Sequence, residues 1–151
     1  MTDADHPPVN PDALEGPHGL VCQAYLEGTV HLGLKYFELN KRGSPVFKLW
    51  ENVLPYAMMA AIVAQYTYDY GYLGFMGSLL LTGLLVFWFA PRWLAKRVRA
   101  RALAMALESE AGWDRLWQSG GLGMRLAKGD NISADSPGDD WRAFAEKYLK
   151  E

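Results

Sequence analysis

The segment from Tyr72 to Ala90 reads YLGFMGSLLLTGLLVFWFA, nineteen residues without a charged side chain. At 1.5 Å per residue, a helix of this length extends about 28 Å, close to the hydrocarbon thickness of a bilayer, about 30 Å. A second apolar stretch, Val53 to Tyr68, precedes it, and Asp69 is the only charged residue between Val53 and Pro91. We therefore predict a two-helix transmembrane hairpin that occupies residues 46–91.

The first apolar stretch is less decisive, because it is short and contains Gln65. If its helix begins at Val46 or Phe47, the length suffices, and Lys48 and Glu51 lie at the interface with their charged groups in water. The alternative is a buried pair of helices within a soluble bundle. Bulk composition does not separate the two, since a half-apolar chain of net charge −2 is typical of a globular protein.

The flanks of the hairpin contain nearly all other ionisable residues and predict four further parts. Residues 1–19, acidic and proline-rich, are expected to form a flexible tail without a cleavable signal. Residues 20–45 are predicted to form one amphipathic cytoplasmic helix, because apolar residues recur there at three- and four-residue spacing. Residues 92–118 are predicted to be a basic amphipathic helix. Residues 119–151 are predicted to be a glycine-rich linker and a short helix capped by Ser136 or Asp139. The predicted fold class is all-α.

The distribution of lysine and arginine predicts an orientation. Basic residues precede the hairpin and follow it but are missing from its turn, and those directly after it are Arg92, Lys96, Arg97, Arg99 and Arg101. The positive-inside bias places both termini in the cytoplasm and makes the chain a multi-pass protein of the cell's inner membrane. The five basic residues are expected to contact lipid headgroups. Leu94 to Leu107, with one apolar face, is predicted to lie on the inner membrane surface; the alternative is a straight continuation of the second helix, packed on the 20–40 helix.

Small residues form a stripe on each predicted membrane helix. Ala57 and Ala61 share a face of the first, and Gly74, Ser78 and Thr82 follow one another at four-residue spacing on the second. Small side chains allow close backbone approach in a bilayer, so we predict that these stripes pack together within the hairpin. Docking of one stripe on another protein is the competing interpretation.

Residues of catalytic or metal-binding type are sparse. The three histidines all precede the hairpin, and the single cysteine, Cys22, is interpreted as a buried apolar residue. The stretch GGLGMRLAKGD has glycines but not the spacing of a phosphate-binding loop. We expect no metal, no cofactor and no catalytic residues. We also expect no nucleic-acid partner, because acidic residues accompany the basic ones in the C-terminal half, among them Glu108, Glu110, Asp114, Asp130, Asp135, Asp139 and Asp140.

Two local stretches resemble a known family. LNKRGSPVFKLWENV, from Leu39 to Val53, and WLAKR, from Trp93 to Arg97, are similar to stretches of the YfbV family of small bacterial inner-membrane proteins, as is the order of features along the middle half of the chain. The chain lacks the Trp-Pro pair that the family has before the first stretch. The resemblance implies a membrane protein with two close helices and a role in insulating the chromosome terminus region. It implies no catalytic residues.

These patterns predict a non-enzymatic membrane protein. The hairpin serves as its anchor, and the cytoplasmic helices serve as an interaction surface. Its expected partners are the lipid bilayer and a membrane protein or a second copy of the chain. The alternative is an accessory or assembly subunit of a larger membrane complex, such as a respiratory, photosynthetic or secretion complex. An enzyme would need a partner or cofactor to supply its chemistry.

Overall fold

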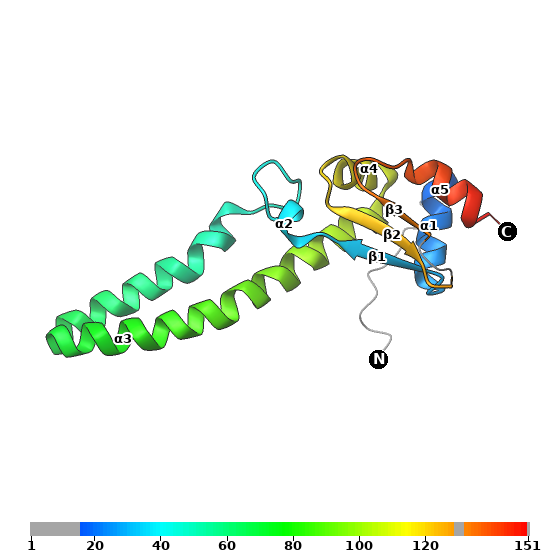
Figure 1. Cartoon of the computed structure of the whole chain (residues 1–151). Coiled ribbons are helices and arrows are strands. Elements are labelled where there is room, and N and C mark those ends of the chain that lie inside the picture. The colour runs from blue at the N-terminus through cyan, green and yellow to red at the C-terminus, as the bar shows by residue number, and fades with distance from the viewer. Residues whose placement is uncertain (1–15, 129–131, 151) are drawn as a thin grey trace. The chain divides into compact units, whose positions relative to one another are not determined.

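The computed structural model describes residues 16–128 and 132–150, and the chain divides into two compact units. The sheet unit consists of Met1–Phe47 and Val98–Glu151, and the helical unit is Lys48–Arg97. Helix α3, Leu49–Glu108, contributes to both units. The protein is mostly helical, as predicted, and contains in addition a small sheet (Figure 1).

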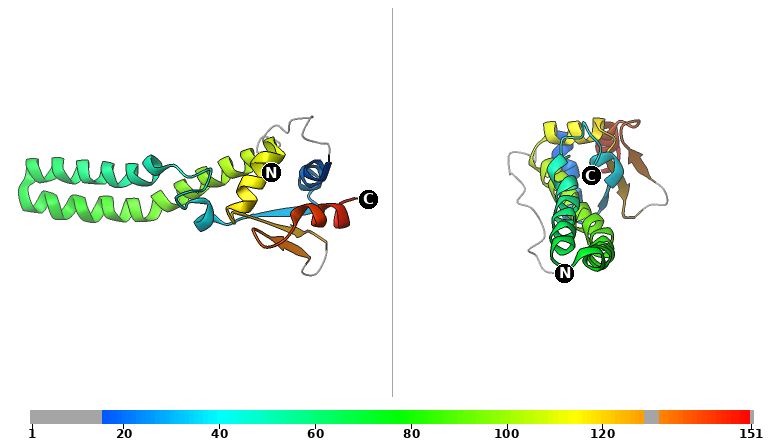
Figure 2. Two further views of the ribbon diagram at one scale, coloured as in Figure 1. Left: turned by 90° about the horizontal axis from the view of Figure 1, so that it is seen from above. Right: turned by 90° about the vertical axis from the view of Figure 1, so that its left-hand side faces the viewer.

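The helical unit consists of most of α3 and changes direction at one residue. Gly71 has φ 62° and ψ −143°, a non-helical conformation that joins two helices. A left-handed φ of this kind costs little for glycine because it has no Cβ. The first arm, residues 49–70, and the second arm, residues 72–97, lie side by side in both views (Figures 1 and 2).

The helix continues through Pro91, which corrects the prediction that the chain turns there onto a membrane surface. Both Pro55 and Pro91 lie inside α3 without interrupting it. Beyond Pro91, the apolar face of the segment is buried: Val98, Ala102 and Ala106 have no exposed surface. Because this face is buried within the sheet unit, it is not available to lie on a membrane surface. The loss of one backbone hydrogen bond at Pro91 does not prevent the helix from continuing.

A three-stranded antiparallel sheet is the element that the all-α prediction missed. Its order is β1 (Val30–Leu34), β2 (Leu122–Leu126), β3 (Ser133–Asp135). In the β1–β2 register, Val30 pairs with Leu126 and Gly33 with Gly123. The predicted 20–45 helix is therefore two helices and a strand, α1 (Gly16–Leu26), β1 and α2 (Tyr36–Leu39), and β2 and β3 lie in the predicted linker. Residues 1–15 of the predicted tail lie outside the described residues, but 16–19 are helical.

The change from helix to strand after Leu26 has a local cause. Gly28 adopts φ 73°, which ends the helical conformation, and the Thr29 hydroxyl donates a hydrogen bond to the Ala24 carbonyl at 3.0 Å. From Val30 onward, apolar residues alternate with His31 and Gly33. This two-residue period places Val30 and its alternate neighbours on one face of the sheet.

The core of the sheet unit lies between this sheet and its helices α1, α4 (Glu110–Gln118) and α5 (Trp141–Tyr148). Trp113 is fully buried at its centre, with ring centroids 5.6 Å from Trp141 and 6.3 Å from Trp117. The Nε2 of His18, also buried, lies 2.8 Å from the Ala106 carbonyl oxygen and so links α1 to the end of α3. Large aromatic side chains thus pack together in the middle of a core that is otherwise mainly aliphatic.

The N-cap of helix α5 lies one residue after Asp139, one of the two predicted caps. The Asp140 carboxylate accepts hydrogen bonds from the backbone N–H groups of Arg142 and Ala143, so Asp140 is the cap rather than Ser136 or Asp139. The sequence predicts an apolar face formed by Trp141, Phe144, Ala145 and Tyr148, and the first three are buried whereas Tyr148 is exposed.

Candidate functional site

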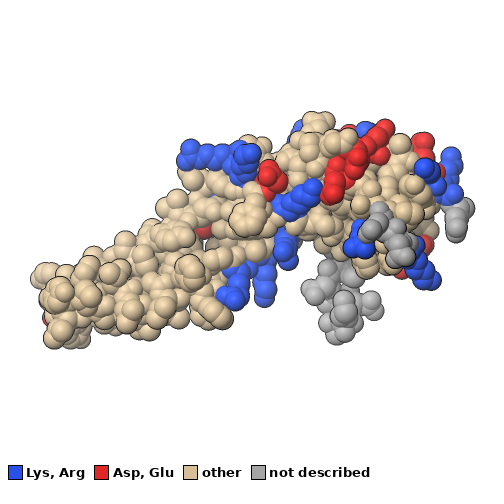
Figure 3. Space-filling view, viewed as in Figure 1, with Lys and Arg blue, Asp and Glu red and all other residues tan. Residues whose placement is uncertain are grey.

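The most distinctive surface of the protein is the outside of the helical unit. Among the described residues, every exposed large apolar side chain except Leu26, Phe37 and Tyr148 lies between Leu49 and Trp93. Figure 3 shows the part of α3 around Gly71 almost without charged side chains. A continuous apolar surface of this extent is costly in water and marks a membrane or protein contact.

By length and composition, α3 can cross a membrane, and it is the one helix in the described part of the chain that can. Its most apolar 18-residue window has a mean hydropathy of 2.0, and 11% of that window is buried. An apolar helix in the core of a soluble protein is mostly buried, so the exposure of α3 distinguishes it from that class.

The small residues predicted for the second arm, Gly74, Ser78 and Thr82, lie on the face that contacts the first arm. Ser78 and Thr82 are each 8% exposed, and their hydroxyls donate to the carbonyls of Gly74 and Ser78, each at 2.6 Å. A Cβ added at Gly74 would overlap the Tyr66 carbonyl oxygen and lie 2.8 Å from the Tyr70 Cβ. Gly74 therefore permits a close backbone approach between the arms.

Ala57 and Ala61 do not belong to this contact, which corrects the prediction for the first arm. Both are exposed, whereas Pro55, Met59 and Val63 are half-buried at the same four-residue spacing. The longer side chains of this second stripe fill the space that small residues leave on the opposite arm. An apolar groove of about 510 Å³ is lined by both arms, with Met58, Ile62 and Phe89 among its residues.

The five basic residues predicted to bind headgroups differ from one another in their contacts and exposure. The Arg92 Nη1 donates to the Trp88 carbonyl at 2.7 Å, and its guanidinium lies 4.1 Å from the centroid of the Trp88 ring. Arg97 lies over Trp93 at 4.9 Å. Lys96 and Arg99 are exposed, and Arg101 is half-buried. Paired arginine and tryptophan side chains are suited to the boundary between hydrocarbon and headgroups.

Glu51 is buried, which corrects the prediction that its carboxylate lies in water. It is 2% exposed, and its Oε1 lies 3.9 Å from the Arg97 Nη1. The pair joins the beginning of the first arm to the end of the second. Arg97 is thus at least partly engaged within the protein, and its availability to lipid is lower than the sequence suggested.

The buried side chains of the sheet unit include a histidine–cysteine contact without the properties of a nucleophile. The Cys22 Sγ lies 3.6 Å from the His18 Nε2, which also contacts the Ala106 carbonyl. Desolvation by burial raises the pKa of the Cys22 thiol to about 11. A reactive thiol needs a lowered pKa and access to solvent. Cys22 is therefore a buried apolar residue, as predicted.

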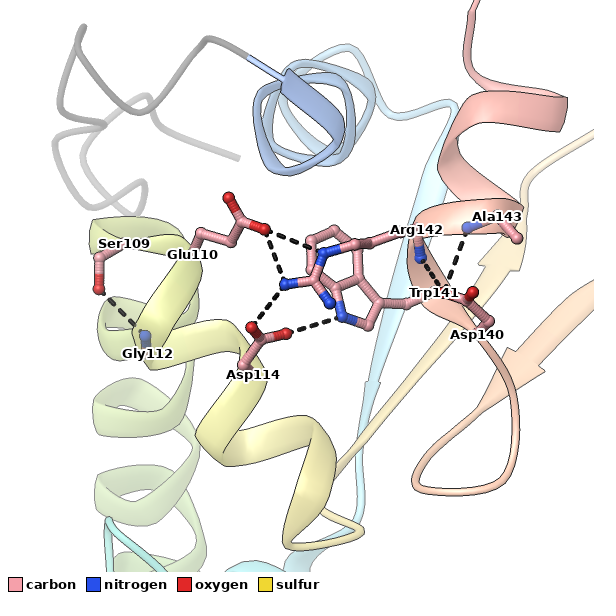
Figure 4. Close-up of polar contacts among 8 residues, drawn as sticks. All are labelled: Ser109, Glu110, Gly112, Asp114, Asp140, Trp141, Arg142 and Ala143. Atoms are coloured by element: carbon pink, nitrogen blue, oxygen red, sulfur yellow. Dashed lines mark hydrogen bonds and ion pairs between the residues drawn. The ribbon is translucent and has the colours of Figure 1, made fainter.

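An ion-pair network joins α4 to α5 (Figure 4). The Arg142 guanidinium donates to Glu110 Oε1 at 2.8 Å and to Asp114 Oδ2 at 2.6 Å, and Asp114 Oδ1 accepts from the Trp141 indole N–H at 3.0 Å. Hydrogen bonds to Glu110 and Asp114 raise the pKa of Arg142. Every charge here has an opposite partner, and the arrangement is that of a structural clamp. Within the described residues, no group of three or more His, Cys, Asp or Glu side chains could hold a metal ion.

Comparison with known proteins adds no relative: no protein family matches the chain, and no curated protein or solved structure does so.

Proposed function

We propose that the protein is a non-enzymatic membrane protein in which the two arms of α3 cross the bilayer as a hairpin. The anchor holds the sheet unit at the cytoplasmic face, where it serves as an interaction surface. The exposed apolar surface between Leu49 and Trp93 supports this proposal. Contact of such side chains with water is unfavourable in free energy, whereas contact with the hydrocarbon of a bilayer is not. The 11% burial of the most apolar window argues against a soluble core helix.

The pairing of β1 with β2 supports an even number of membrane crossings. Strand β1 precedes the apolar arms in the chain and β2 follows them, yet the two strands share a hydrogen-bonded register. Partners in one sheet must lie on the same side of any membrane, since a sheet with unsatisfied polar backbone does not form in hydrocarbon. The chain between them therefore crosses an even number of times, and two arms provide two crossings.

The basic residues supply the orientation in this proposal. Lys96 and Arg99, both exposed, are available to anionic headgroups of the inner leaflet, and Arg92 and Trp88 form an interfacial anchor. The turn around Gly71 contains tyrosines and no lysine or arginine. We accordingly propose the inner membrane as the location, with both flanks cytoplasmic.

Cysteine accessibility tests the proposal directly. In a Cys22→Ala background, single cysteines are placed at Asp69 in the turn and at Lys147 in α5, both exposed positions. In intact spheroplasts, a membrane-impermeant maleimide should label Asp69→Cys and leave Lys147→Cys unlabelled until the membrane is permeabilised. Labelling of both from outside, or release of the protein by alkaline carbonate, would refute the hairpin.

A subunit of a larger membrane complex is the second candidate, and one observation favours it. Gln65 is exposed on the same face of the first arm as Ala57 and Ala61, and its side-chain amide donates to Asp69 at 3.0 Å. Polar amides within a bilayer commonly bond to a neighbouring helix. Native mass in mild detergent decides: a complex that Gln65→Leu disrupts favours the subunit, and an unchanged monomer favours the anchor.

A further inference from the structure

The outer face of the three-stranded sheet forms a recess that the membrane anchor does not use. Strand alternation turns one set of residues away from the core: His31, Gly33 and Lys35 from the β1 side, Gly123 and Arg125 from β2, and Ser133 and Asp135 from β3. These residues line a shallow cavity of about 340 Å³. That volume is near the lower end of the range for small-molecule sites.

Two paired glycines form the floor of the recess. Gly33 is exposed, and a Cβ added there would meet only the Gly123 carbonyl oxygen, at 3.7 Å. Its peptide backbone is therefore open to a ligand. At Gly123, by contrast, a Cβ would lie 2.9 Å from the Asp135 Oδ1, so this glycine makes room for the Asp135 carboxylate. Glycine within a strand often marks close approach by another group, and here none of the described residues occupies the approach at Gly33.

The two ends of the recess differ in charge. At one end, the Lys35 Nζ lies 3.0 Å from the Asp135 Oδ1, and these charges offset each other across β2. At the other end, His31 and Arg125 are register partners and both are exposed. Among the residues that the structure describes, which exclude 129–131, Asp135 is the only carboxylate that lines the recess. The His31–Arg125 end is consequently positive, with the Ser133 hydroxyl opposite Arg125 in the β2–β3 register.

We propose that this recess binds a small phosphorylated molecule, with its phosphate at Arg125 and His31 and its body over Gly33. The planar guanidinium of arginine matches two phosphate oxygens at once, and imidazole and hydroxyl groups supply further donors. A flat molecular body fits over Gly33 because no side chain in the described part of the chain lies within 4 Å of a Cβ placed there. The site lies wholly within the sheet unit, so it does not depend on membrane insertion.

Two probes separate the contributions of phosphate and body: inorganic phosphate, and phenyl phosphate, which adds a planar ring. The full protein is reconstituted in phosphatidylcholine nanodiscs, and the His31 ring and Gly33 amide resonances are followed by NMR during titration. We expect saturable shifts with both probes and tighter binding of phenyl phosphate. Absence of saturable shifts at millimolar concentrations of either probe would overturn the proposal.

Three variants test the assignment of residues. Arg125→Gln should weaken both probes by about tenfold or more, the usual loss for a hydrogen bond to a charged group. Gly33→Val, whose Cβ has ordinary contacts in the fold, should remove the advantage of phenyl phosphate and leave inorganic phosphate bound. Arg115→Gln, an exposed arginine on α4 outside the recess, is the charge-matched control. Equal losses in Arg125→Gln and Arg115→Gln would show a general charge effect and refute the site.

Discussion

Replacing Gly74 by alanine should force the two arms of α3 apart. The added Cβ would lie 2.8 Å from the Tyr70 Cβ and 3.0 Å from the Tyr66 carbonyl carbon, whereas carbon atoms in contact are normally about 3.5–4.0 Å apart. The overlap is therefore about 0.5–1 Å, and part of it is with backbone, which cannot rotate away. Overpacking of this kind typically costs about 1–3 kcal/mol.

Gly77→Ala is the matched control, because a Cβ at Gly77 would meet nothing within 4 Å. Both glycines are helical, so the gain in helix propensity, about 1 kcal/mol at most, is common to the two variants and cancels in their difference. We expect Gly74→Ala to unfold at a lower SDS mole fraction in mixed micelles than Gly77→Ala, by about 1–3 kcal/mol. Equal stability of the two variants would refute a close approach of the arms at Gly74.

Three further predictions concern single residues. Gly71→Ala should lower the free energy of unfolding by about 1–3 kcal/mol through backbone strain alone, since its φ is 62° and no atom lies within 4 Å of the added Cβ; Gly83→Ala, in a helical position with open space, should not. Cys22 should not react with a thiol reagent at pH 8 in the folded protein but should do so in denaturant, because burial keeps it protonated until the pH approaches its raised pKa of about 11; rapid native labelling would contradict its burial. Arg142→Gln should lower stability by about 1 kcal/mol at low salt and less at high salt, measured by thermal unfolding, because its partners Glu110 and Asp114 are partly exposed.

The apolar arms could be predicted from the sequence, but which of their faces meet could not. Few soluble proteins contain uncharged runs of this length, and the two apolar arms of α3 follow from these runs. Four-residue spacing, however, occurs in two stripes of the first arm, one through Ala57 and one through Pro55, and spacing alone does not rank them. The structure selects the stripe with larger residues, since it complements the small residues of the second arm.

The sheet was missed because its strands are short and their partners distant. Val30 and Leu34 fit both a three-to-four and a two-residue period, and five residues are too few to separate these periods. The stretch from Leu122 to Leu126 alternates more clearly, but its glycines suggested a linker. The recess at Gly33 and Arg125 depends on this pairing, so no local pattern could reveal it.

The division of the sheet between the two ends of the chain sets an order of events during synthesis. β1 is made first, but β2 leaves the ribosome about 90 residues later, a delay of roughly 5–20 s at ordinary translation rates. Throughout that interval, β1 has two unpaired edges and α1 lacks the buried surface that Trp113 and α5 provide. Residues 16–47 must therefore remain accessible to chaperones and proteases until the apolar arms and the C-terminal half have been produced. A ribosome that stalls after Arg97 leaves a chain whose N-terminal portion has no folded state to adopt, so completeness of the polypeptide is a condition for its survival.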